Sequence, residues 1–475
     1  MIFFYLVSSL IFASALLINR NALINKFLVL GFLVLQISYT VFTFMHQNVV
    51  EATYFMPDAL AILMTVTLTI IAIPTLLHRY DYMYKEQDTP NNQGLYYGAM
   101  VIFVMALTAG YLASHIAVTW IFVEITTLSA SVLIFHRRNA GSIEATWKYI
   151  FVCSISLVFV FIGILLLSLA MGDQYEAGMQ YDTLIRLAPS LNSFWLKLAF
   201  IFIFTGYTVK LGLAPMYTAG IDAKDKAPTP AAALFSSVLM NLGFVGIFRM
   251  YLITAHSSIL GWVNTIILIT ALLSVFVATV YMMKVKNIKR MLAYSSIEHM
   301  GIVMIGIGVG GIGYYAAILQ LILHSFIKSS LFLQVGHLYK TFKSKEIFAM
   351  GNYFKYNTSG GIFLLLAFFG ITAIPPSGLF ISEFYIIIAL VKAHALIILI
   401  PLLSLLTIII WAYGKNMFKI LFIPSMNFDK TGLEKSNPYE TLSHYLLLTL
   451  IVYLGFFPPT TFVALIQATI HSLPI

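Results

Sequence analysis

Four ionisable residues stand inside long apolar stretches of the sequence, where a charge is costly. They are Glu124, Lys210, Lys328 and Glu383. Placing an ionisable group at the centre of a membrane costs at least about 2.5–3.5 kcal/mol on insertion scales. A buried lysine beside a carboxylate holds or releases a proton according to its neighbour's charge, and a series of such pairs can move protons without a cofactor. Structural ion pairs are the alternative, although all four residues are too central to reach the headgroups.

Two further residues extend this set. His324 precedes Lys328 by four residues, which places both on one face of a helix. Lys148 stands at the start of an apolar stretch, where a role in a relay and a position beside the headgroups are both open. His299 and His337 add titratable groups near the ends of such stretches.

The composition indicates which elements must position these residues. The 475 residues are 60% hydrophobic and 9% charged, with a mean hydropathy of +0.93. A typical soluble domain is about 25% charged. A water-soluble fold of this size cannot bury so much apolar surface, which excludes a soluble enzyme, a disordered chain and a fibrous chain. We therefore expect an all-α polytopic membrane protein, because helices satisfy their own backbone hydrogen bonds in lipid.

Fourteen apolar windows are long enough to cross a bilayer, for which about 20 residues suffice. The windows lie at about 2–18, 27–43, 59–77, 95–114, 116–135, 149–170, 194–215, 228–254, 261–283, 291–309, 313–339, 360–391, 398–422 and 441–468. Most basic residues fall in the odd-numbered loops between them, for example Arg137, Arg138, Lys289 and Arg290. The positive-inside rule makes these loops cytoplasmic, so both termini should face outward from the cytoplasmic membrane.

Proline interrupts two of the predicted spans. The seventh window ends Lys210-Leu-Gly-Leu-Ala-Pro215, and the twelfth contains Pro375 and Pro376. Proline removes a backbone donor and breaks a helix, which leaves carbonyl groups free at depth. If spans 4–8 and 9–13 are two five-helix units, both breaks fall on the fourth helix of a unit. Because each unit has an odd number of spans, the second unit is inverted in the membrane relative to the first. Matched broken helices of this kind mark an ion pathway.

This pattern predicts four segments. A three-helix segment covers residues 1–94, and the two inverted repeats, each a half-channel, cover 95–254 and 261–422. A loop and the last helix follow at 423–475.

The sequence contains no pattern for a cofactor or metal site of its own. Cys153 is the one cysteine and the histidines are scattered, so we expect neither a cofactor nor a protein-bound metal. The net charge of +9 does not indicate nucleic-acid binding, because the basic residues serve membrane topology. The stretches between the windows are too short for a soluble catalytic domain. Any redox centre must therefore belong to a partner, and the chain by itself is not clearly an enzyme.

Five segments in this order make the chain resemble a known family, the antiporter-like proton-translocating subunits of respiratory complex I, Mrp-type antiporters and membrane-bound group 4 hydrogenases. The segments are Phe122-Val-Glu-Ile-Thr-Thr127, Ile143-Glu-Ala-Thr-Trp-Lys-Tyr149, Lys289-Arg-Met-Leu-Ala-Tyr-Ser-Ser-Ile-Glu-His-Met-Gly301, His324-Ser-Phe-Ile-Lys-Ser-Ser-Leu-Phe332 and Ile374-Pro-Pro-Ser-Gly-Leu-Phe-Ile-Ser-Glu-Phe384. The resemblance covers nearly the whole chain, most strongly about residues 115–390. It is greatest to the component F type of the hydrogenase-4 class.

The resemblance implies a role for each buried residue. Glu124 and Lys210 would form the central couple of one half-channel, and breaking their ion pair would lower the lysine's affinity for its proton. Lys328 and Glu383 would form the second half-channel, with His324 beside them. Lys148 matches a lysine on the sixth span of the family.

The chain also departs from the family pattern. After the seventh span the family commonly has Pro-x-His-Thr-Trp-Leu-Pro-Asp-Ala-His, where this chain has Tyr217 for the first histidine, Ala219-Gly220-Ile221 for Trp-Leu-Pro, and Lys224 for the last histidine. Asn241 occupies the place of an eighth-span lysine that complex I subunits usually carry. Asparagine can bind water but carries no charge, so the relay between the two halves would run through water, histidine or Lys328, or be weaker than in complex I.

Three functions fit these observations. The first is a proton-translocating subunit, or one sharing sodium, of a hydrogenase-4-like or formate-hydrogenlyase-like complex. Its partners would be other membrane subunits and peripheral redox subunits with NiFe and iron–sulfur centres. The second is a membrane partner of a soluble zinc protein in inorganic-carbon uptake. The third is a structural subunit that no longer conducts, against which the complete set of four buried ionisable residues argues.

Overall fold

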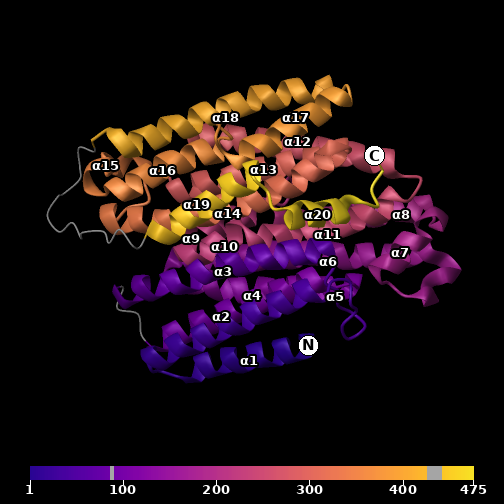
Figure 1. Cartoon of the computed structure of the whole chain (residues 1–475), viewed down its shortest axis with the longest axis horizontal. Coiled ribbons are helices and arrows are strands. Elements are labelled where there is room, and N and C mark those ends of the chain that lie inside the picture. Colours follow the sequence, from indigo (N-terminus) through magenta and orange to yellow (C-terminus); the bar gives the residue numbers. More distant parts are fainter. Residues whose placement is uncertain (86–89, 425–440, 475) are drawn as a thin grey trace. The chain divides into compact units, whose positions relative to one another are not determined.

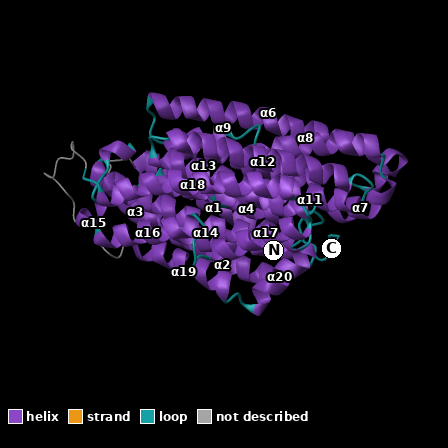
Figure 2. Ribbon diagram, turned by 90° about the horizontal axis from the view of Figure 1, so that it is seen from above, coloured by secondary structure: helices purple, strands orange, loops and turns teal. Residues whose placement is uncertain are grey.

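The structure is a computed structural model that describes residues 1–85, 90–424 and 441–474, and among these residues every regular element is a helix (Figures 1 and 2). Each of the fourteen predicted windows coincides with one helix or with a pair of helices. Eleven described helices are long and apolar enough to cross a membrane, or twelve if the broken pair α19 and α20 forms one span. Two further apolar helices, α1 and α16, are shorter. The expectation of an all-α polytopic membrane protein is confirmed.

The first of two compact units comprises Met1–Ile266 and Thr461–Ile475. Its helices are α1 (Ile2–Ile18), α2 (Ala22–Met45), α3 (Ala59–Lys85), α4 (Pro90–Leu112), α5 (Ile116–Phe135), α6 (Ala140–Met171), η1 (Gly172–Ala177), α7 (Tyr181–Leu187), η2 (Ala188–Ser190), α8 (Ser193–Leu211), α9 (Thr218–Lys226), α10 (Thr229–Ser236), α11 (Val238–Ala255), the start of α12 (Leu260–Lys284), and α20 (Thr460–Ile470). Helices α4, α5, α6 and α8 pack in sequence, and α6 and α8 run side by side (Figure 2). An 18-residue stretch of the span formed by α10 and α11 is wholly buried.

A buried ion pair anchors α11 within this unit. Arg249 Nη1 donates to Asp58 Oδ2 at 2.9 Å, and Nη2 donates to the carbonyl oxygen of Tyr111 at 3.2 Å. These contacts tie α11 to the start of α3 and the end of α4, and account structurally for a charge that lies in an apolar window.

The second unit comprises Ile267–Thr460. Its helices are the remainder of α12, α13 (Ile288–Val309), α14 (Ile312–Phe342), η3 (Ile347–Ala349), α15 (Tyr353–Tyr356), α16 (Thr358–Ile371), α17 (Gly378–Lys392), α18 (Leu396–Phe422) and α19 (Leu442–Phe456). An 18-residue stretch of α14 is wholly buried, and the helix packs against α13, α16, α17 and α19. The central position of α14 explains why residues on all its faces are shielded.

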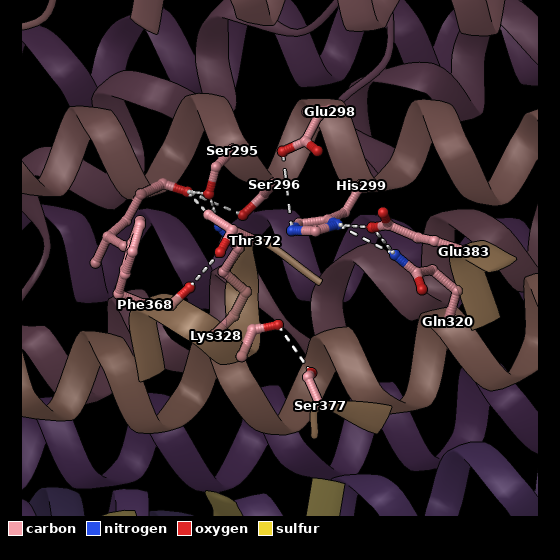
Figure 3. A network of polar contacts seen from close by, with 12 residues as sticks. Ser295, Ser296, Glu298, His299, Gln320, Lys328, Phe368, Thr372, Ser377 and Glu383 are labelled. Atoms are coloured by element: carbon pink, nitrogen blue, oxygen red, sulfur yellow. Dashed lines mark hydrogen bonds and ion pairs between the residues drawn. The ribbon is translucent and has the colours of Figure 1, made fainter. Parts of the chain in front are cut away.

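Both proline-containing windows are interrupted. Helix α8 ends at Leu211, and Gly212 follows with φ of 82°, a left-handed conformation that suits glycine. In the second unit α16 ends at Ile371 and α17 begins at Gly378. There Thr372 Oγ1 donates to the carbonyl of Phe368 at 2.7 Å, and Ser377 Oγ donates to that of Gly370 at 3.0 Å (Figure 3). Side-chain hydroxyls thus satisfy carbonyl groups that the break exposes.

The predicted segments 1–94, 95–254, 261–422 and 423–475 remain predictions. The first two fall within the first compact unit and most of the third falls within the second. Residues 425–440 of the last segment lie outside the described residues.

Candidate functional site

Lys210 lies in the last turn of α8, directly before the break. Its side chain is 3% exposed. Nζ donates to Thr127 Oγ1 on α5 at 2.7 Å and to the Tyr149 hydroxyl on α6 at 3.2 Å. The ammonium group also lies 5.2 Å from the centre of the Tyr149 ring, within cation–π range. Hydroxyl groups from two helices therefore hold this buried cation.

Glu124 lies one helical turn before Thr127 on α5, and so on the same face. Its Oε2 atom is buried and accepts no hydrogen bond in the described structure. Electrostatic attraction acts between Glu124 and Lys210, but no hydrogen bond or ion pair joins these two described residues. The predicted couple is thus arranged with the acid on α5 one turn from Thr127, and with Thr127 holding the lysine of α8.

Lys148 is in a different environment from the other predicted residues. Its side chain is 54% exposed in the isolated chain. Nζ lies 2.5 Å from Glu144 Oε1, four residues earlier on α6, and 3.9 Å from Asp222 Oδ2 on α9. The structure therefore places Lys148 at the periphery of the first unit, paired with two acids.

Lys328 lies in the middle of α14 and is fully buried. Its Nζ donates to the carbonyl oxygen of Leu292 at 2.8 Å and to Ser295 Oγ, both on α13 (Figure 3). His324 lies one turn earlier on α14, and its ring centre is 5.4 Å from that of His299. The second predicted lysine is therefore also held by hydroxyl and carbonyl oxygens, next to a pair of histidines.

Glu383, on α17 just after the second break, belongs to a connected group of polar side chains (Figure 3). His299 Nδ1 lies 3.6 Å from Glu383 Oε1, and His299 Nε2 lies 3.8 Å from Glu298 Oε2. Gln320 Nε2 on α14 lies 3.1 Å from both His299 Nδ1 and Glu383 Oε1. Ser382 in turn donates to Gln320 Oε1. The imidazole of His299 therefore stands between two carboxylates, one at each ring nitrogen.

A cavity of about 260 Å³ adjoins this group in the second unit. Its polar lining includes Ser295, Glu298, Thr372, Glu383 and Tyr413. A water molecule occupies roughly 30 Å³ in the liquid, so there is room for several. Both carboxylates and the serine that binds Lys328 thus share one space that water can occupy.

The arrangement suits proton transfer better than metal binding. Glu298, His299 and Glu383 offer ligand atoms within 4.8 Å of one another, which a metal ion could use. The two carboxylates, however, face opposite nitrogens of the same ring, so the imidazole separates them. A neutral imidazole has a donor on one nitrogen and an acceptor on the other, and can relay a proton between them.

The sequence analysis missed Glu298 as a site residue. Glu298 lies inside the apolar window 291–309 and is 4% exposed, so it met the criterion that selected the other four. Thr127, Tyr149, Ser295 and Gln320 were also missed as site residues, and no sequence signal separates them from ordinary polar helix residues. Only their position against the buried lysines and acids does so.

Comparison with known proteins places the chain among membrane subunits. Residues 113–409 match the family described as NADH:quinone oxidoreductase/Mrp antiporter, TM. A similar sequence is the hydrogenase-4 component F homolog of Methylacidiphilum infernorum, 27% identical over 343 residues, which are 70% of this chain and 72% of the relative.

Two solved structures share the fold. A chain of the membrane-bound sulfane sulfur reductase, described as an archaeal respiratory membrane complex, superposes with a TM-score of 0.87 at 20% identity, covering 99% of this chain and 97% of the other. A chain of the Mrp complex from Dietzia sp. DQ12-45-1b gives 0.84 at 15% identity, covering 99% and 96%. The likeness extends over the whole chain.

Proposed function

Because the chain belongs to the NADH:quinone oxidoreductase/Mrp antiporter transmembrane family, we propose that it is the proton-translocating subunit of a hydrogenase-4-like or formate-hydrogenlyase-like complex. The predicted resemblance to antiporter-like subunits of complex I, Mrp and group 4 hydrogenases is confirmed by the family match and the relatives. The chain is accordingly an antiporter-like, multi-pass membrane subunit. The hydrogenase-4 assignment is supported by the 27% identical component F homolog.

The observation that carries a conducting role is the contact series in the second unit. Lys328 binds Ser295, Ser295 and Glu298 line the same cavity, and His299 links Glu298 to Glu383. A subunit with a structural role alone has no need for a lysine, two acids and a histidine buried together, since apolar residues of similar volume are often as stable. Their retention supports a pathway.

In this mechanism a proton moves by successive transfers between these groups. A proton taken up by Glu383 passes to one nitrogen of His299, while the opposite nitrogen gives its proton to Glu298. Water in the cavity and Ser295 connect Glu298 to Lys328. No bond other than those to hydrogen is made or broken. His299 ends as its other tautomer, and a ring flip or proton exchange through water restores the starting tautomer before the next transfer.

Lys210 acts correspondingly in the first unit. Its flexible side chain alternates between the hydroxyls of Thr127 and Tyr149 and the buried, unsatisfied oxygen of Glu124. An ammonium group that moves away from the acid loses its counter-charge and gives up a proton more readily. Redox chemistry in NiFe and iron–sulfur partner subunits supplies the driving force.

The finer topology belongs to the same proposal. Fourteen spans with two inverted repeats, spans 4–8 and 9–13, would place the breaks at 212–217 and 372–377 in matching positions. Both termini would face outward from the cytoplasmic membrane. Cysteine labelling of a variant with a cysteine inserted after Met1, and of a His471→Cys variant, from either side of sealed vesicles tests this; labelling of either end from the cytoplasmic side would contradict it.

The function is tested with the intact complex, purified through this chain and reconstituted into vesicles that contain a pH-sensitive dye. We expect NiFe and iron–sulfur subunits to co-purify, and Glu124→Gln and Lys210→Ala to abolish proton movement in an assembled complex. Lys197→Ala, on the same helix as Lys210, is the matched control and should transport normally. A protonophore added at the end verifies the gradient.

Two outcomes would contradict the proposal. Unchanged pumping in both variants would refute the relay, and co-purification of a large zinc protein without redox subunits would favour a role in inorganic-carbon uptake. Replacing sodium with choline in the same assay decides the ion, because a sodium-coupled subunit loses transport and a proton-specific one does not.

A further inference from the structure

A further lysine, Lys224 on α9, is buried, and among the described residues no acid forms an ion pair with it. It is 5% exposed. Within the part of the chain that the structure describes, its Nζ donates one hydrogen bond, to Met240 Sδ at 3.2 Å, and makes no ion pair. A thioether sulfur is a weak acceptor. Lys224 follows the seventh predicted span, in an odd-numbered loop where the positive-inside rule favours a basic residue but requires no burial.

The two acids of the same helix are directed to other lysines. Asp225 Oδ2 lies 3.4 Å from Lys226 Nζ, and Asp222 Oδ2 lies 3.9 Å from Lys148 Nζ. Lys226 is partly exposed, with 38% of its side chain accessible. Lys226 and Lys224, separated by one residue on α9, therefore differ in solvation and in pairing. Lys226 is partly solvated and paired with an acid, whereas Lys224 is buried and has no acid partner among the described residues.

A buried lysine with no acid partner is destabilising when it is charged. Helix α9 is not among the segments long enough to span a membrane, and there burial lowers the pKa of Lys224 to about 7. A packing role would be met at less cost by methionine or leucine of similar volume. The chemistry retained by a lysine here is the ability to bind and release a proton near neutral pH.

One turn of α11 connects Lys224 to Lys210. Met240, which accepts from Lys224, is followed three residues later by Gly243. A Cβ atom at Gly243 would lie 2.9 Å from Lys210 Cβ, so the backbone of α11 touches α8 at that lysine. The same turn of helix is therefore in contact with both lysines, on the two sides of the break at 212–217.

We propose that Lys224 is a second proton-carrying residue of the first unit, which accepts the proton that Lys210 releases and passes it on beyond the helix break. The transfer converts Lys210 from ammonium to amine and Lys224 from amine to ammonium, with water bridging the gap, so that charge and protons balance. This inference rests on the proposed proton translocation and adds a residue and a direction to it.

The charged groups near Lys224 set the background for a test by pH. Helix α9 packs against α6, α8 and α10. The titratable or charged residues on these elements are Glu144, Lys148, Tyr149 and Cys153 on α6, Lys197, Tyr207 and Lys210 on α8, and Asp222, Asp225 and Lys226 on α9; α10 has none. Helix α11, which contacts Lys224 through Met240, carries Arg249 and Tyr251. The acids and Lys148 are common to all the variants below, so they do not account for differences between them.

The test uses the reconstituted complex with Lys224→Met, Lys224→Arg and Lys224→His, and Lys226→Met as the matched control from the same helix. We expect transport to fall at least tenfold in Lys224→Met. A positioned proton-transfer group contributes about 100-fold or more to a rate, and bypass by water would reduce the observed loss. Arginine should be equally inactive, because its guanidinium keeps charge and size but does not release its proton. Histidine, with an ordinary pKa of about 6.5, should restore part of the transport with an optimum at lower pH.

Each outcome decides between roles. Normal transport in Lys224→Arg would show that only the positive charge is needed, and would overturn the proposal. So would normal transport in Lys224→Met, or a loss in Lys226→Met equal to that in Lys224→Met. If Lys224→Met does not assemble, the arginine and histidine variants give the answer. Lys210→Ala and Lys328→Met are included in every experiment. A loss in Lys210→Ala with normal transport in Lys224→Met refutes this inference alone, whereas normal transport in both Lys210→Ala and Lys328→Met refutes the proposed function.

Discussion

The two buried lysines of the predicted relay differ in both position and surroundings, since Lys210 ends a broken helix and Lys328 lies in the middle of a continuous one. Lys210 is held by two hydroxyl groups, and its acid, Glu124, lies a helical turn from the hydroxyl that binds it. Lys328 is held by a serine and a carbonyl oxygen, and that serine opens on a cavity shared with two acids. His299 joins those two acids, whereas no described histidine plays that part beside Lys210.

Under the proposed function, this difference implies that the two units would move protons in different ways. In the second unit, contacts between neighbouring side chains and a cavity with room for several water molecules connect Glu383, His299, Glu298 and Lys328. A proton could therefore move along these groups while the side chains stay in place. In the first unit transfer requires Lys210 itself to move between Thr127 and Glu124. We therefore expect the first unit to depend on side-chain freedom and the second on an unbroken series of groups.

Removing either lysine should have the largest effect. Lys210→Met and Lys328→Met should each reduce proton transport by about 100-fold or more, since each removes a group that the proton must occupy. Initial rates of dye quenching in vesicles measure this, with assembly verified by the yield of co-purified subunits. Equal losses would indicate one pathway in series; full transport in Lys210→Met with none in Lys328→Met would show that only the second unit conducts.

Replacing the histidine bridge should have the next largest effect. His299→Phe keeps a flat aromatic ring at this position but removes both imidazole nitrogens. Transport should therefore fall about tenfold, with water in the adjoining cavity providing a slower route. His394→Phe, at an exposed residue beyond α17, is the control. A normal rate in His299→Phe would mean that Glu298 and Glu383 exchange protons through the cavity without the imidazole.

A smaller effect is expected at the hydroxyl that holds Lys210. Thr127→Val preserves shape and removes one hydrogen bond worth about 0.5–1.5 kcal/mol. Transport should fall roughly threefold to tenfold, and Thr127→Ser should recover it because the hydroxyl returns. An increase in rate would contradict the idea that Thr127 positions the lysine, and would show that its hydrogen bond retards movement toward Glu124.

The smallest effect is expected at Lys148. Its pairing with Glu144 is an exposed contact between residues four apart, which contributes about 0.3–0.5 kcal/mol to stability. Lys148→Ala should therefore change transport by less than about threefold, and Glu144→Ala should behave alike. A loss as large as that of Lys210→Met would move Lys148 from the periphery to the centre of the relay.

Much of the fold followed from the distribution of apolar residues. Long apolar windows must form helices in lipid, because an unpaired backbone group has no other partner there. Pro215, near Lys210, and Pro375 and Pro376 predicted the two helix breaks, because proline lacks the backbone N–H that a helix needs. By length and composition the described helices give eleven or twelve spans rather than fourteen, because α1 and α16 are shorter than a full span.

The site divides along the same line. The sequence by itself determined that Glu124, Lys210, Lys328 and Glu383 are functional candidates, because the cost of a charge in lipid depends on the residue and on its apolar neighbours in the chain. It did not determine which groups face them. Burial of Glu298 against His299, the hydroxyls of Thr127, Tyr149 and Ser295, and the isolation of Lys224 all depend on helices distant in sequence. Proton transfer requires contact within a few ångströms, and only tertiary packing decides which contacts exist.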